Sequence, residues 1–194
     1  MSLYKAIKQS IIHESPELRR TRLTQWRHSH VIERINRPTN LSKARSLGYR
    51  AKQGIILARV RVLRGGRQRP MLKGGRRTKT MRRMKVLNMT YQTICEQRAN
   101  KKYPNCEVLN SYYVNEDGRH LWYEVILIDV AHPAILADPK LQWITKNKHT
   151  GRVYRGLTGS GKRTRGLGNK GKGTEKLRPS HAGSIRHKRR RLNW

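Results

Sequence analysis

A run of 62 residues without a carboxylate places the strongest constraint on what this chain can fold into. From Arg34 to Cys95 the sequence holds eighteen lysines and arginines and neither aspartate nor glutamate. Such a segment cannot pair its charges within itself, and it repels itself unless a polyanion neutralises it. The whole chain of 194 residues has 45 lysines and arginines against 11 acidic residues, a formal net charge of +34. We therefore expect a nucleic acid, an anionic membrane surface or an acidic protein as the partner.

Other features of the sequence narrow the choice among these three classes of partner. No apolar run approaches the roughly 18 residues of a membrane-spanning helix, and the first residues, MSLYKAIKQSIIHES, lack a secretory apolar region, so no membrane partner is expected. Cys95 and Cys106 are too few for a disulfide framework or a four-ligand zinc site, which fits a reducing, intracellular setting. No helix-turn-helix, zinc-finger or basic-zipper pattern is present, so sequence-specific DNA reading is not expected. RNA is the favoured partner.

The acidic residues gather in the part of the chain that reads as a folded core. Residues 96 to 138 hold seven acidic and four basic side chains. Within them, Val108 to Asn115 and Leu121 to Asp129 are rich in β-branched and aromatic residues, and the intervening Asn-Glu-Asp-Gly is typical of a hairpin loop. This pattern predicts an antiparallel pair of strands.

Further elements complete the prediction of an α+β fold. Ile56 to Leu63 alternates as a third strand. Apolar residues at helical spacing predict a helix over about Met89 to Lys101, packed on the sheet. A second helix is expected to begin at Ser15-Pro16, after a first one over about Leu3 to Ile12. The expected fold is a small, mostly antiparallel sheet with packed helices, plus long basic glycine-containing extensions that lack their own core.

The expected organisation has five segments. They are N-terminal helices (1–33), a basic segment leading into a core strand (34–63), a basic RNA-binding loop (64–85), an α+β core of helix and hairpin (86–145) and a basic glycine-rich C-terminal extension (146–194).

Two stretches are too polar to fold alone. Residues 64–85 carry ten basic residues and four glycines, and residues 151–194 carry nine glycines and a terminal basic cluster. Neither buries enough apolar area to offset a backbone entropy cost of roughly 1–2 kcal/mol per residue, so we expect both to lack partners within the polypeptide and to order on RNA. The RNA-binding residues expected on this ground are Arg64, Arg67, Arg69, Lys73, Arg76, Arg77, Lys79, Arg82, Arg83, Lys85, Lys176, Arg178, Arg186, Lys188, Arg189, Arg190 and Arg191.

Single aromatic residues within the basic stretches have two interpretations. Tyr49, Tyr154 and Trp194 could stack on unpaired bases or pack on the protein's own surface. We include Tyr49 among the candidate RNA-binding residues.

Several motifs resemble nucleotide or metal sites. Gly156 to Arg163 nearly matches a phosphate-binding loop, but Arg163 replaces the hydroxyl residue that holds Mg²⁺. Gly166 to Gly171 matches a dinucleotide pattern without the strand and helix that such a site needs. His28 and His30 lack zinc-site spacing. No catalytic constellation is present, so an RNA-dependent NTPase using the glycine-rich loop is an alternative of low weight, as is a non-ribosomal RNA chaperone.

Three long stretches resemble one known family. ERINRPTNLSKARSLGYRAKQG from Glu33, VLNSYYVNEDGRHLWYEVILIDVAHPAI from Val108 and RVYRGLTGSGKRTRGLGNKGKGTEKLRPS from Arg152 are similar to ribosomal protein fifteen of the large subunit. This is the family shared by archaea and eukaryotes, distinct from the universal protein with the same number.

The resemblance implies a structural, non-enzymatic protein of the cytoplasmic ribosome. Its implied partners are large-subunit ribosomal RNA and neighbouring ribosomal proteins, with no small-molecule substrate and no cofactor beyond structural Mg²⁺ or K⁺ at the RNA interface. The RNA-binding positions that it implies are Arg34, Arg37, Lys43, Arg45, Arg50, Lys52, Arg152, Arg155, Lys162, Arg163, Arg165, Lys170 and Lys172.

Overall fold

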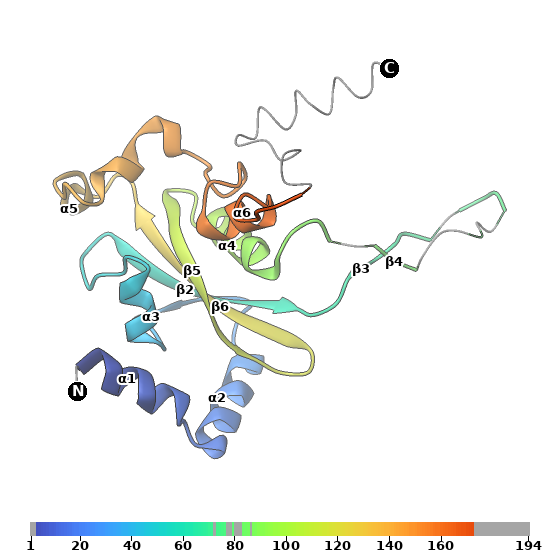
Figure 1. Ribbon diagram of the computed structural model, residues 1–194, viewed down its shortest axis with the longest axis horizontal. Helices are drawn as coiled ribbons and strands as arrows, with labels where there is room; N and C mark the ends of the chain where they lie inside the picture. The colour runs from blue at the N-terminus through green and yellow to red at the C-terminus, as the bar shows by residue number, and fades with distance from the viewer. Residues whose placement is uncertain (1–2, 72, 77–78, 80–82, 86, 173–194) are drawn as a thin grey trace.

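The fold is built on one four-stranded antiparallel sheet. The computed structural model describes residues 3–71, 73–76, 79, 83–85 and 87–172. The strands are β1 (Ile32–Ile35), β2 (Ile55–Leu63), β5 (Cys106–Glu116) and β6 (His120–Asp129), in the order β1-β2-β6-β5. The predicted α+β class and the three predicted strands are confirmed (Figure 1).

The burial of the central strand β6 shows that both faces of the sheet are covered. Seven of its ten residues are buried, in a nearly continuous run from Leu121 to Ile128, and a strand buried on both faces loses the alternation of a half-exposed one. The hairpin to β5 is tight. The Asp117 carboxylate accepts hydrogen bonds from the backbone N–H groups of Arg119, at 2.7 Å, and His120.

One face of the sheet is covered by the helix α4 (Tyr91–Lys102), close to the predicted range. Thr90 caps its first turn, because its hydroxyl accepts a hydrogen bond from the Thr93 N–H. Cys95 and Ala99 are fully buried against Val60 and Leu127. These contacts form the largest part of the apolar core.

The opposite face is covered by α2 (Pro16–His28) and by α3 (Leu41–Ser46), and α1 (Leu3–Ile12) lies beside α3 (Figure 1); the two N-terminal helices were predicted. Leu23 and Trp26 of α2 pack on Trp122. Ala44 of α3 packs with Leu57. Neither β1 nor α3 was predicted.

The chain after β6 returns to the body and does not form a free extension. It contains α5 (Pro133–Leu136), two short 3₁₀ helices, η1 (Gln142–Thr145) and η2 (Asn147–His149), and α6 (Gly159–Thr164), which lies beside α4 (Figure 1). Val153, Ser160 and Gly161 are buried. The prediction that everything from residue 151 onward lacks contacts with the core is therefore wrong for its first part. The remainder, residues 173–194, lies outside the described residues.

The basic loop after β2 is an arm that extends away from the sheet (Figure 1). Its two-residue strands β3 (Arg67–Gln68) and β4 (Met84–Lys85) pair with each other. Every residue that the structure describes between 64 and 85 is exposed, which agrees with a segment that has no core of its own. Within the described ranges, none of the helices is both long and apolar enough to span a membrane.

Candidate nucleic-acid interface

Among the residues that the structure describes, the arm (residues 64–85) presents a long series of exposed cations. Arg64 at its root is the one arm residue near a carboxylate in the described part, with Nη1 3.9 Å from Glu116 Oε1, and this guanidinium also donates to the Asp117 carbonyl at 3.0 Å. Arg77 and Arg82 lie outside the described residues. The exposed basic residues of the arm are Arg64, Arg67, Arg69, Lys73, Arg76, Lys79, Arg83 and Lys85. Their charges are available to an external polyanion.

A second basic group surrounds α3, and most of it is exposed. Arg45 is held by Tyr4 of α1, whose hydroxyl accepts a hydrogen bond from the guanidinium and whose ring centre lies 5.8 Å from it. Lys52 is half-buried and pairs with Asp138 at 2.9 Å. This hydrogen bond lowers the pKa of the Asp138 carboxyl. The exposed members of this group are Arg34, Arg37, Lys43, Arg45 and Arg50.

The expectation that the basic run finds no partner within the polypeptide needs a correction. Lys52 pairs with Asp138, and Arg59 pairs with Glu33. Both carboxylates come from outside the run, so segment composition could not reveal them. The arm beyond Arg64 has no such ion pair among its described residues, and the expectation holds there.

Tyr49 and Arg152 have partners inside the protein. The Tyr49 ring is 9% exposed and packs with Ala44 and Leu57, which leaves little surface for a base to stack on. Arg152 is 8% exposed. Its Nη1 donates to the carbonyls of Val108, at 2.9 Å, and Leu109, at 3.3 Å. These contacts account for both side chains without RNA.

The buried Glu96 anchors the glycine-rich segment to the body. Its Oε2 accepts a hydrogen bond from Thr158 at 2.6 Å, and its Oε1 accepts one from the Ser111 hydroxyl. Burial of this carboxyl raises its pKa, although both hydroxyl donors oppose the shift. Because Thr158 also caps α6, the anchor positions Lys162 and Arg163 of that helix at the surface.

The glycines of this segment serve close packing. A Cβ on Gly161 would lie 2.7 Å from the Gly156 Cα, so the two backbones touch. The segment from Gly156 to Arg163, which resembles a phosphate-binding loop in sequence, is preceded by the 3₁₀ helix η2 and includes part of α6, which has only six residues. This arrangement differs from a phosphate-binding loop, which lies between a strand and a long helix.

The remaining candidate residues of the C-terminal segment divide into three groups. Arg155 and Arg165 are half-buried; Arg155 donates to the carbonyls of Lys148 and Thr150, and Arg165 to that of Gly156. Lys170 and Lys172 are exposed. The candidates outside the described residues are Lys176, Arg178, Arg186, Lys188, Arg189, Arg190 and Arg191.

A second buried carboxyl, Glu124, fixes the loop that carries Arg37. Its Oε2 accepts hydrogen bonds from the Thr39 N–H, at 3.1 Å, and from the Tyr112 hydroxyl. Burial raises the pKa of Glu124. The carboxylate thus ties the connection between β1 and α3 to the middle of the sheet.

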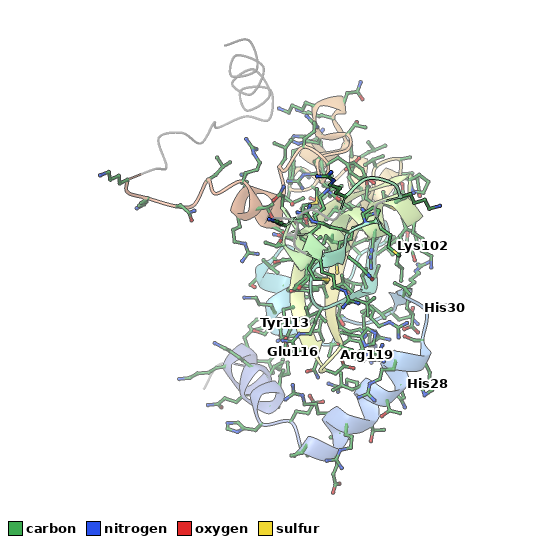
Figure 2. All side chains as sticks on the ribbon, turned by 90° about the vertical axis from the view of Figure 1, so that its right-hand side faces the viewer. His28, His30, Lys102, Tyr113, Glu116 and Arg119 are labelled. Carbon is green, nitrogen blue, oxygen red and sulfur yellow. The ribbon has the colours of Figure 1, made fainter. Side chains whose placement is uncertain are left out.

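Sequence reasoning missed exposed cations that lie on helices and turns. Figure 2 labels Lys102 at the end of α4 and Arg119 in the β5–β6 hairpin, on the same side as His28 and His30. These two cations lie outside the long basic runs, in the segment that holds seven acidic and four basic residues, so no charge run marked them. Across the described ranges, no three His, Cys, Asp or Glu side chains lie together in a way that could hold a metal ion. The full set of missed exposed cations is Lys5, Lys8, Arg19, Arg20, Arg27, Arg98, Lys101, Lys102, Arg119, Lys140, Lys146 and Lys148.

Comparison with known proteins distinguishes a ribosomal component from other basic proteins. The sequence profile of the family described as Ribosomal L15 matches residues 2–184. The chain belongs to the ribosomal L15 family. This ribosomal L15 chain is 52% identical over 160 residues to "Large ribosomal subunit protein eL15" of Methanocella arvoryzae, with 82% of each chain covered. It is 53% identical over 160 residues to the protein of the same name from Methanospirillum hungatei, again with 82% of each covered. The resemblance found in the sequence is confirmed.

Proposed function

We infer that this protein is a structural constituent of the large ribosomal subunit that binds and stabilises ribosomal RNA. The observation that carries this inference is the arm, in which every described residue is exposed and none is acidic. A free protein gains nothing from holding such a charge density apart from its body, whereas folded RNA concentrates phosphates in its interior. The two eL15 relatives carry the subunit in their names.

The mechanism is electrostatic and geometric. Each lysine or arginine that neutralises a phosphate releases condensed counterions, which supplies affinity. Arginine adds forked hydrogen bonds to phosphate oxygens. The sheet and its helices fix where the arm, the α3 region and α6 emerge, so the cations meet RNA segments at set spacings. Binding therefore favours one packing of those segments.

The proposed partners are large-subunit RNA and neighbouring proteins of cytoplasmic ribosomes. Structural Mg²⁺ or K⁺ ions are expected where phosphates crowd together at this interface. We propose no enzymatic role, because the glycine loop that resembles a nucleotide site is occupied by contacts to Glu96 and between Gly156 and Gly161.

A binding titration tests this function. Purified full-length protein should bind large-subunit ribosomal RNA, and log K should fall with log salt at a slope of about one unit per neutralised phosphate, giving a total of at least ~5 for the arm. A slope of about one or two would contradict the proposal, since so few neutralised phosphates could not account for the arm.

A further inference from the structure

Two adjoining cavities lie where the arm leaves the sheet. They have volumes of about 530 and 260 Å³, and both are lined by Gly65, Gly66, Leu87 and Tyr91. We call them together the arm-root groove. Small-molecule sites commonly measure ~300–1,000 Å³, so the groove has room for a nucleotide.

An aromatic wall forms one side of the groove. Tyr123 lines the larger cavity together with Met89. The Tyr113 ring lines neither cavity but stands edge-on to Tyr123, with centres 5.9 Å apart, and is 46% exposed near the hairpin end of β5 (Figure 2). Aromatic surface left open beside a cavity is a platform on which a planar ring can stack.

The backbone at Gly65, which lines both cavities, is held in place by Tyr91. Its hydroxyl accepts a hydrogen bond from the Gly65 N–H at 2.7 Å and donates one to the Gly65 carbonyl at 3.2 Å. Gly65 has φ +94°, a conformation that favours glycine, and a Cβ there would meet no atom within 4 Å. The Gly65 backbone is thus fixed while the space beside it stays open.

The charge around the groove selects an anionic partner. Arg64, Arg67 and Arg98 line the smaller cavity, and neither cavity has a carboxylate in its lining. An apolar peptide would cover the aromatic wall but leave Arg67 and Arg98 without counter-charges, whereas Arg64 already lies 3.9 Å from Glu116. An unpaired nucleotide satisfies both, because its base stacks and its phosphates bind arginine.

We propose that the arm-root groove receives an unpaired nucleobase of ribosomal RNA, stacked on Tyr123 beside Tyr113, with the flanking phosphates bound by Arg64 and Arg67. This inference rests on the proposed function, since the RNA that surrounds the arm supplies the base. It makes the root of the arm a site for single-stranded RNA, while the rest of the arm binds phosphates of any structure.

Matched tyrosine variants of the full chain test this proposal. Tyr123→Leu removes the wall and keeps an apolar side chain. Tyr103→Leu is the control, because Tyr103 packs on the same core cluster as Tyr123 but lines neither cavity. The probes are a short single-stranded oligouridine RNA and an RNA duplex of equal length. We expect Tyr123→Leu to weaken binding of the single strand about 10-fold, with the salt slope and duplex binding unchanged, and Tyr103→Leu to change neither.

Other outcomes would overturn the proposal in distinguishable ways. If both variants behave alike while the parent still binds ribosomal RNA with a steep salt slope, the groove holds no base although the proposed function stands. If Tyr123→Leu leaves RNA binding intact but abolishes association with a neighbouring ribosomal protein, the groove holds a peptide. If the parent binds no ribosomal RNA at all, both proposals fail.

Discussion

Two acidic side chains of this basic protein, Glu96 and Glu124, are fully buried. Each accepts hydrogen bonds from residues distant in sequence, and each ties a segment with exposed cations to the sheet. A buried carboxyl is costly without such partners, because water no longer solvates it. These two residues therefore position the basic surface without touching an external partner.

Removal of Glu96 tests its role as an anchor. Glu96→Ala deprives the Ser111 and Thr158 hydroxyls of their acceptor and opens a cavity. We expect the free energy of unfolding to fall by about 2–4 kcal/mol in urea denaturation of the free chain. Glu96→Gln retains the shape and an acceptor, so its loss should be smaller. Equal losses in the two variants would argue against these hydrogen bonds.

The buried carboxyls also set the direction of a pH dependence. In the unfolded chain Glu96 and Glu124 have pKa values near the ordinary ~4.3, and burial raises both in the folded state. Above that pH the folded state binds more protons, so their contribution to the free energy of unfolding decreases as pH rises through the raised pKa values. Asp117 and Asp138 have lowered pKa values, so their contribution to the free energy of unfolding is instead lost as pH falls, and only below about pH 4. In unfolding measurements from pH 5 to 8, the free energy of unfolding of the Glu96→Gln variant should decline less with rising pH than that of the parent. A steeper decline in the variant would contradict this account.

Glycine packing in the C-terminal segment gives a further test at single residues. Gly161→Ala places a methyl group against the Gly156 backbone. We expect a loss of about 1–3 kcal/mol in unfolding free energy from this overpacking. Gly168→Ala is the control, since a Cβ there meets nothing within 4 Å. If both substitutions were neutral in thermal unfolding, the close contact between the two glycines would not be important for stability.

At the scale of elements, the sequence predicted the elements that have long local signals. β2 and α4 were predicted from their apolar periodicity, and β5 and β6 from runs rich in β-branched and aromatic residues on either side of a hairpin loop. β1 has four residues and α3 has six, too short for a periodic signal. β1 forms by pairing with β2, and α3 is capped by the Asn40 side chain. Thr39, between the two elements, donates to Glu124, which lies 85 residues away along the chain.

The candidate interface was also predictable only in part, where local composition determines it. The exposed arm follows from composition, since its residues have few apolar anchors. The buried state of Arg152 and the docking of α6 depend on partners far away along the chain, such as Val108 and Glu96. Composition alone placed the glycine-rich segment outside the body, because its packing uses hydroxyls and glycine contacts and little apolar surface.

The arm as an element makes a prediction about RNA affinity. Replacing Arg67, Arg69 and Lys85 by Gln should lower the salt slope of ribosomal RNA binding by about three, one unit for each lost phosphate contact. Their exposure means that the unfolding free energy should not change. A triple Gln variant of exposed cations on α1 and α2, Lys5, Lys8 and Arg20, carries the same charge change. Equal effects in the two variants would mean that net charge, and not the arm, determines binding.

The whole molecule separates two tasks. The apolar core on both faces of the sheet maintains the fold, while the arm, the α3 region and the surface of α6 carry charges that no other part of the described chain neutralises except at a few ion pairs. Such a protein is suited to hold RNA segments at fixed spacing. Its function is then inseparable from the particle it stabilises.

Sucrose-gradient sedimentation of cell extracts in which the chain carries an affinity tag tests this account most directly. We predict that the protein sediments with the large ribosomal subunit and remains there after a wash in moderate salt, because many phosphate contacts must be lost together for it to dissociate. Its presence mainly in the light fractions, or its even distribution over all RNA-containing fractions, would contradict the account.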